Sequence, residues 1–272
     1  MPPAIRTPFA GICSAVADRY RRIFSLREIE ESLVLQLVFG ATLFSYFIAF
    51  FQWTGSHATT IDAYLDGTLR CRPYFQGCGD FLFLHALPEG YSQAILYMVL
   101  MELLFCAAYF GATKRWTLAH IALVPAFLWH TAVVFFLTDS IGGNYDYYLF
   151  LFALVLLFVP HKEYFLKIIF VFSYVLASTI KIHEGWVLGT YFSSLKTGLP
   201  IFPKWSIPLL TNSVIFMQMV GSWFLLSRKS FWQRATVLYF LVFHFYSGFI
   251  VEYRYPATVA PTLFFLFGPL YR

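Results

Sequence analysis

One lysine stands at the end of a long apolar run and is followed at once by polar and aromatic residues. The segment reads Lys181-Ile-His183-Glu184-Gly-Trp186. A lysine that is held away from water has a lowered pKa, and its neutral amine can then act as a base near physiological pH. The other interpretation is an interfacial anchor, whose stem lies in the membrane while its ammonium group reaches water. The sequence alone leaves both interpretations open.

Four further ionisable residues fall within apolar runs, namely Glu102, His130, His244 and Glu252. Such residues are costly inside a bilayer and indicate functional sites by default. His244 and Glu252 are eight residues apart with Gly248 midway, so all three share one face of a helix. We expect this face at the outer side of the membrane, with His244 in a site. For Glu102 and His130 the alternative is a hydrogen-bonded group that only fixes helix packing.

The residues after Lys181 predict an irregular outer segment that is rich in aromatic side chains. Two prolines in Gly198-Leu-Pro-Ile-Phe-Pro203 prevent an α-helix there, so we expect a short surface helix and then a turn into the next span. Trp186, Tyr191 and the aromatic residues near them suit the membrane interface. They suit a pocket for a flat apolar ligand equally well.

The elements that must position these residues are transmembrane helices. The chain has 272 residues, of which 59% are hydrophobic, 21% aromatic and 12% charged. Globular domains carry about 25% charged residues, and here the apolar residues come in unbroken blocks without periodic stripes. The net charge is +5, but the basic residues are dispersed between the blocks, which does not fit nucleic-acid binding. The predicted fold class is an all-α, polytopic integral membrane helical bundle whose first partner is the lipid bilayer.

A transmembrane helix needs about 20 mainly apolar residues, and the sequence supplies eight candidate segments. We expect spans at residues 33–53, 91–111, 116–138, 147–160, 164–180, 208–226, 232–252 and 256–270. The fourth and eighth are short, which predicts tilted or broken helices inside the bundle. Residues 33–272 then form one transmembrane domain with long outer loops at 54–90 and 181–207. Because function tends to lie in long loops on a rigid scaffold, the outer face is the predicted active face.

The distribution of basic residues predicts the orientation. Thirteen of the 19 Lys and Arg residues fall on one side of these spans, and the richer side is cytoplasmic. Both termini are therefore predicted to be cytoplasmic. We expect a multi-pass protein of the plasma membrane, which is the inner membrane if the protein is bacterial. Residues 1–32 form a cytoplasmic N-terminal segment, in which the mixed charges of residues 18–31 favour an amphipathic helix on the membrane surface. A flexible tail is the alternative.

Two of the four cysteines, Cys71 and Cys78, share an outer loop that also contains a proline and a glycine. A disulfide between them is chemically reasonable if the loop faces an oxidising compartment. The nearest histidines do not complete a familiar set of metal ligands, so no metal is predicted. Cys13 and Cys106 are interpreted as single thiols, and Cys106 as a small apolar filler within the second span.

Three segments carry a resemblance to the transmembrane domain of vitamin K-dependent γ-carboxylases and to the wider group of horizontally transferred transmembrane proteins. They are Ile180-Lys-Ile-His-Glu-Gly-Trp-Val-Leu-Gly189, Phe243-His-Phe-Tyr-Ser-Gly248 and Phe265-Leu-Phe-Gly-Pro269. A weaker match lies in Asn144-Tyr-Asp-Tyr-Tyr-Leu149. The resemblance covers the chain from about His130 onward.

The resemblance implies a quinol-dependent activity. In that family the lysine that corresponds to Lys181 deprotonates reduced vitamin K, and oxygen then converts it to a strong base that removes a γ-proton from glutamate before carbon dioxide adds. By this resemblance Lys181 is the base, His244 lies beside the quinone, and a reduced, vitamin K-like quinone is the expected cofactor. The remaining residues expected to bind substrate or quinone are Asn144, Asp146, Tyr148, His183, Glu184, Trp186, Tyr191 and Glu252.

This chain differs from the carboxylases in two features, and both argue against the full carboxylation reaction. Asp146 stands where the carboxylases carry a histidine, and no lumenal domain follows the last span. We therefore do not expect a carboxylase of propeptide-bearing proteins. We expect a membrane enzyme that performs quinol-linked or other base-initiated oxidation of a small or lipid-like substrate. The first alternative is a non-catalytic subunit or assembly factor of a larger membrane complex. The second is a transporter, although the sequence shows no internal repeat.

Overall fold

The fold is built from helices alone in the part of the chain that can be placed. The computed structural model describes residues 8–78, 91–136, 143–194, 198–250 and 253–268. Within these ranges the only β-type pairing is one isolated bridge between Arg72 and Phe75. The helices are α1 (Pro8–Ile23), α2 (Leu26–Glu31), α3 (Leu33–Leu65), α4 (Tyr91–Ala112), α5 (Trp116–Phe136), α6 (Asn144–Phe158), α7 (Lys162–Thr179), α8 (Glu184–Val187), α9 (Thr190–Ser194), η3 (Lys204–Ser206), α10 (Ile207–Met219), η4 (Gly221–Leu226), α11 (Ser230–Ile250) and α12 (Arg254–Phe267).

Three of the described helices are long and apolar enough to cross a membrane. They contain the segments Leu33–Ser56 in α3, Ile95–Ala112 in α4 and Trp116–Phe136 in α5, and α6 adds a shorter apolar segment. Each of the eight segments that we predicted as spans is helical over most of its described residues. The prediction of an all-helical protein with membrane-spanning helices is therefore confirmed at this coarser level.

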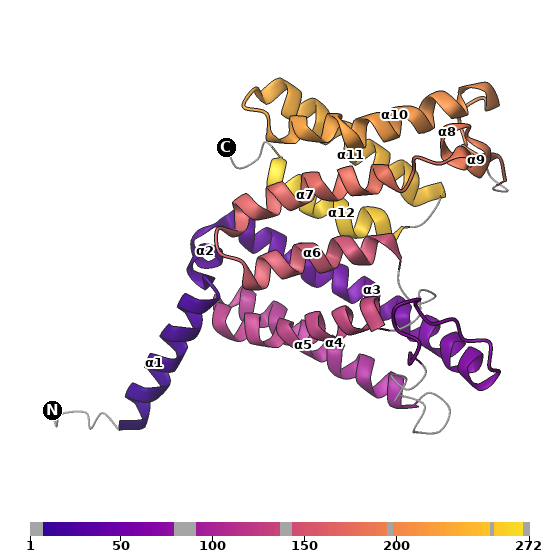
Figure 1. Ribbon diagram of the computed structural model, residues 1–272. Helices are drawn as coiled ribbons and strands as arrows, with labels where there is room; N and C mark the ends of the chain where they lie inside the picture. The colour runs from indigo at the N-terminus through magenta and orange to yellow at the C-terminus, as the bar shows by residue number, and fades with distance from the viewer. Residues whose placement is uncertain (1–7, 79–90, 137–142, 195–197, 251–252, 269–272) are drawn as a thin grey trace.

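The long helices pack side by side in one bundle (Figure 1). The helices α4 and α5 pack together at one edge, and α10 and α11 lie at the opposite edge. Between them α3, α6, α7 and α12 form the middle of the bundle. The small helices α8 and α9 lie at one end of the bundle and α2 lies at the other (Figure 1). The predicted surface helix after Lys181 therefore exists as two short helices.

Two elements differ in detail from the expectation. The helix α3 continues to Leu65, so the outer loop expected at 54–90 begins with three further helical turns. No proline occurs between residues 54 and 65, so the polar sequence there can continue the helix. The sixth span, expected over 208–226, is divided into α10 and the 3-10 helix η4.

The segment α1–α2 is fixed to the bundle at the end opposite α8. The Tyr20 hydroxyl lies 2.7 Å from Nδ1 of the buried His120 on α5. The carboxylate of Glu28 accepts hydrogen bonds from the backbone N–H groups of His161 and Lys162, at 2.9 and 2.7 Å. These are the unpaired donors at the start of α7, and a negative charge is favourable at that helix terminus. Glu28 therefore acts as a remote cap for α7.

Replacement of Glu28 by alanine should lower stability, because it leaves two N–H groups of α7 without their acceptor. We expect a loss of about 1–2 kcal/mol, as for other helix caps. The measurement is thermal unfolding of the purified protein in detergent. Glu31→Ala is the matched control, because Glu31 contributes only an exposed ion pair with Arg27. Equal effects of the two changes would contradict the capping role.

Candidate functional site

A cavity of about 570 Å³ lies at the α8–α9 end of the bundle, between α7, α10 and α11. This volume is within the range of small-molecule sites, about 300–1,000 Å³. Most of its wall is apolar and aromatic. Six residues that we predicted for the site line this cavity, namely Tyr148, Lys181, His183, Trp186, Tyr191 and His244. The structure thus brings the two main candidates, Lys181 and His244, to one cavity.

Lys181 directly follows the C-terminus of α7 and is half-buried. Its Nζ donates a hydrogen bond of 2.7 Å to the Ala177 carbonyl and lies 5.4 Å from the centre of the Trp186 ring. No carboxylate lies within ion-pair distance of this amine among the described residues. Burial lowers the pKa of Lys181 from its ordinary value near 10.5 to about 8. A substantial fraction of the amine is therefore neutral near physiological pH.

His244 is held rigidly in the cavity wall. Its ring is 3% exposed, and its Nε2 lies 2.8 Å from the Tyr174 hydroxyl on α7. Tyr174 itself is fully buried and stacks on Phe240 with ring centroids 4.0 Å apart. The other ring nitrogen, Nδ1, is buried and has no hydrogen-bond partner. His244 is therefore a lining residue of the cavity with one fixed ring nitrogen that has no partner among the described residues.

Gln218 on α10 is a second lining residue with an unused polar atom. Its side chain is 2% exposed, and its Oε1 has no hydrogen-bond partner. Leaving a buried acceptor unsatisfied costs about 1–3 kcal/mol, which a ligand with a donor group would recover. Sequence reasoning missed both Gln218 and Tyr174. An uncharged glutamine in the middle of an apolar run was the one signal that could have indicated the former.

Aromatic side chains cover the outer side of the cavity. Trp186 and Tyr191 stack with ring planes 16° apart, and Phe192 packs edge-on against Trp186. The Tyr246 hydroxyl on α11 donates a hydrogen bond to the Pro200 carbonyl, which fixes the proline-containing segment against that helix. These contacts make the α8–α9 region a wall that limits the access of water to Lys181.

Gly189 sets the turn between α8 and α9. Its φ is +72°, and a Cβ placed there would lie 2.6 Å from a side-chain carbon of Ile207 on α10. Only glycine combines this backbone conformation with such a close approach. Asn212 strengthens the same junction, because its amide donates to the Val187 carbonyl at 2.8 Å. The junction therefore positions Trp186 over Lys181.

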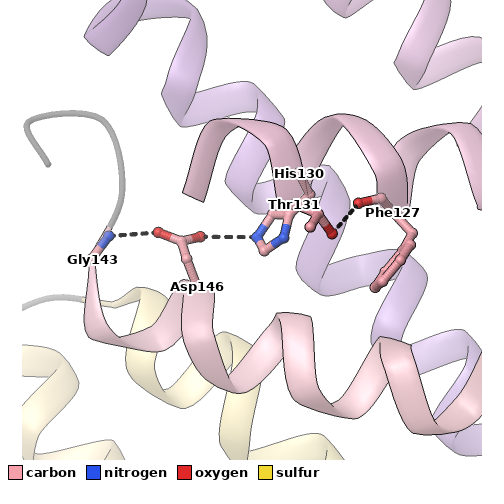
Figure 2. A network of polar contacts seen from close by, with 5 residues as sticks. All are labelled: Phe127, His130, Thr131, Gly143 and Asp146. Carbon is pink, nitrogen blue, oxygen red and sulfur yellow. Dashed lines mark hydrogen bonds and ion pairs between the residues drawn. The ribbon is translucent and has the colours of Figure 1, made fainter. Parts of the chain in front are cut away.

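Asp146 and His130 form a separate polar pair away from the cavity wall (Figure 2). The buried Asp146 accepts a hydrogen bond from His130 Nε2 at 3.4 Å and another from the Gly143 N–H at 2.6 Å. Trp53 stacks on the His130 ring with centroids 5.1 Å apart. Asp146 therefore caps α6 and ties it to α5. Asp146 does not line the cavity that contains Lys181, and the packing alternative for His130 agrees with the geometry.

The other predicted residues divide into three groups. Glu184 is exposed and is not part of the cavity wall. The Asn144 side chain and the whole of Glu252 lie outside the described residues. Cys71 and Cys78 form a disulfide. In the described part of the chain, no cluster of His, Cys, Asp and Glu has the arrangement of a metal site.

Glu102 and Cys106 do not have the packing roles that we considered for them from the sequence. Both are exposed on α4, so Cys106 does not fill a gap in the core. Glu102 makes no hydrogen bond or ion pair with the described residues, so it does not fix the packing of helices within the chain. The cause is helix rotation: α4 packs on α3 and α5, and these residues face the other way.

Comparison with known protein families, characterised proteins and solved structures finds no match to this chain. The resemblance to the γ-carboxylase membrane domain therefore remains an expectation from the sequence motifs. The chemistry of the site has to be argued from its own residues.

Alanine at Gly189 should destabilise the outer wall more than alanine at Gly198. Both glycines have a positive φ, but nothing lies within 4 Å of a Cβ at Gly198. Both changes incur about 1–2 kcal/mol of backbone strain, and only Gly189→Ala adds the collision with Ile207. We expect a clearly lower midpoint of thermal unfolding for Gly189→Ala than for Gly198→Ala. Similar midpoints would contradict the close packing of α8–α9 on α10.

Proposed function

We propose that this chain is a membrane-embedded enzyme in which the Lys181 amine acts as a base toward a flat, apolar molecule with an acidic hydroxyl group. The substrate is oxidised after its proton has been removed. One observation carries the proposal: an amine with no carboxylate partner among the described residues lines an aromatic cavity of about 570 Å³. A lysine that served only as an interfacial anchor would extend its ammonium into water, whereas this Nζ turns back to the Ala177 carbonyl.

A reduced quinone of the vitamin K type fits the polar atoms and the apolar wall of the cavity. His244 Nδ1 and Gln218 Oε1 are buried polar atoms without partners, and they lie in a wall that is otherwise mainly apolar. This is the combination by which proteins recognise a flat ring with few polar substituents. When bound, a reduced quinone supplies an acidic hydroxyl and two electrons for an acceptor such as dioxygen.

The residues around the cavity would have different roles in this reaction. Lys181 Nζ accepts the hydroxyl proton and becomes an ammonium group, which its half-buried position allows to return the proton to water. Tyr174 holds the His244 ring in place through its 2.8 Å hydrogen bond, so that Nδ1 orients the ligand. Trp186 and Tyr191 restrict water at the outer side. A positioned base of this kind contributes about 100- to 10,000-fold to a rate.

Lys181→Met should abolish oxidation of a soluble 1,4-naphthohydroquinone and leave binding of this compound intact. The substitution keeps an apolar side chain of similar length and removes the amine. We expect a loss of about 100- to 10,000-fold in kcat/KM. Lys181→Arg is the matched control, since it keeps a positive charge but stays protonated. It should be equally inactive. The protein is purified, and oxidation above the uncatalysed background is followed by absorbance. Full activity in either variant would remove the lysine from the mechanism.

The pH dependence provides an independent check. Lys181 can accept a proton only when its amine is neutral, so activity should be lost as pH falls below its pKa of about 8. We expect kcat/KM to rise about tenfold per pH unit below pH 8 and to level off above it. Binding of the quinone, measured by its effect on thermal stability, should not follow this curve. An activity that stays constant between pH 6 and pH 9 would contradict a lysine base.

We further propose that the eight long helices cross the membrane with both termini in the cytoplasm. The excess of basic residues on one side supports this orientation. The disulfide between Cys71 and Cys78 supports it as well, because such bonds persist in oxidising compartments. The Lys181 cavity then opens on the extracytoplasmic half of the bundle.

Single cysteines at Lys204 and Lys229 test this orientation, because both residues are exposed at loops between helices. In a background with Cys13 and Cys106 replaced by serine, a membrane-impermeant maleimide should label Lys204→Cys in intact cells. It should label Lys229→Cys only after the membrane has been permeabilised. The reverse pattern would place the cavity on the cytoplasmic side and would contradict the proposed orientation.

A further inference from the structure

One face of α4 is not covered by the rest of the chain. The helix lies at the edge of the bundle and packs on α3 and α5 only along its other side (Figure 1). The uncovered residues follow helical spacing, and large apolar side chains among them are more than half exposed: Ile95 55%, Met98 67%, Val99 52%, Phe105 57% and Tyr109 62%. Glu102 lies in the middle of this stripe. None of these residues lines the Lys181 cavity.

Glu102 makes this face unsuited to contact with lipid alone. It lies halfway along a segment that is long and apolar enough to span a membrane. A carboxyl group near the middle of a bilayer is costly whether it is charged or neutral, unless it is hydrogen-bonded. The described part of the chain offers Glu102 no hydrogen bond and no ion pair. A group on a second molecule at the uncovered face would supply this partner.

We infer that two copies of this chain pair through the uncovered face of α4, with their Glu102 carboxyl groups hydrogen-bonded to each other. A neutral carboxyl both donates and accepts a hydrogen bond, so it is complementary to a second copy of itself. In a pair related by a two-fold axis along the membrane normal, the two Glu102 residues lie at the same depth. Residues near the axis then meet their own equivalents.

The rest of the stripe supports a pair of copies. Met98, Val99 and Phe105 flank Glu102 by one turn on either side, so they would exclude lipid from the two carboxyl groups. Interhelical hydrogen bonds combined with close packing of this kind stabilise helix association in membranes. The exposed Cys106 lies one turn from Glu102 on the same face. In the pair, the two Cys106 thiols would therefore lie close to the axis.

Single-molecule photobleaching of the fluorescently labelled full chain in lipid vesicles measures the pairing directly. We expect the wild type to dimerise at increasing protein-to-lipid ratios. Glu102→Leu should weaken association about 5- to 30-fold, the loss expected for one interhelical hydrogen bond. Glu102→Gln should retain most of it, because an amide also donates and accepts. Met98→Leu is the control on the same face and should behave as the wild type.

Cross-linking reports which face is used. With Cys13 replaced by serine, a short thiol-reactive cross-linker should join two chains in the membrane through Cys106, and Glu102→Leu should reduce the yield. Thermal unfolding of each variant shows that it is folded. Three results would each overturn the inference. The wild type could stay monomeric, Glu102→Leu could associate as strongly as the wild type, or a second protein could occupy this face in place of a copy. Activity at Lys181 is not needed for either measurement.

Discussion

The interior of a bilayer offers no water, so every polar group placed there needs a partner within the protein. Helices solve this problem for the backbone, and the side chains follow the same rule. The hydroxyl groups of Thr42 and Ser45 on α3 donate hydrogen bonds to backbone carbonyl groups one turn earlier in the same helix. The buried His120 bonds to Tyr20 and to the Leu157 carbonyl. Most polar side chains within the bundle are thus paired, many of them within their own helix and some, such as His120, with a neighbouring helix.

Buried polar atoms without a hydrogen-bond partner are the exceptions to this rule. The space beside them distinguishes a binding site from ordinary packing. Some unpaired polar atoms, such as the Tyr46 hydroxyl and Trp53 Nε1, surround the His130 ring in a tightly packed aromatic cluster. Neither residue lines the Lys181 cavity. His244 Nδ1 and Gln218 Oε1 differ, because both belong to the wall of a cavity. An unused polar atom supports a binding function only where there is space for the molecule that would use it.

The sequence predicted those features that depend on local composition, and missed those that depend on helix rotation. Apolar blocks located the helices, and the spacing of Lys181 and His244 from their helix ends placed both at the same end of the bundle. Asp146 is at that end too, but the rotation of α6 turns it toward His130 on α5. Rotation also decides that Glu102 faces outward. In a helix that is apolar all round, no periodicity in the sequence records which face is covered.

In the proposed function, the position of Lys181 at the end of α7 reconciles two opposed requirements. A base must be shielded from water so that its amine is neutral, yet it must release its proton to water after each turnover. A lysine in the middle of a span would meet only the first requirement, and a freely exposed lysine only the second. Lys181 follows the end of α7, with its amine against the Trp186 ring and its neighbours His183 and Glu184 exposed. The end of a transmembrane helix is therefore a better place for such a base than its centre.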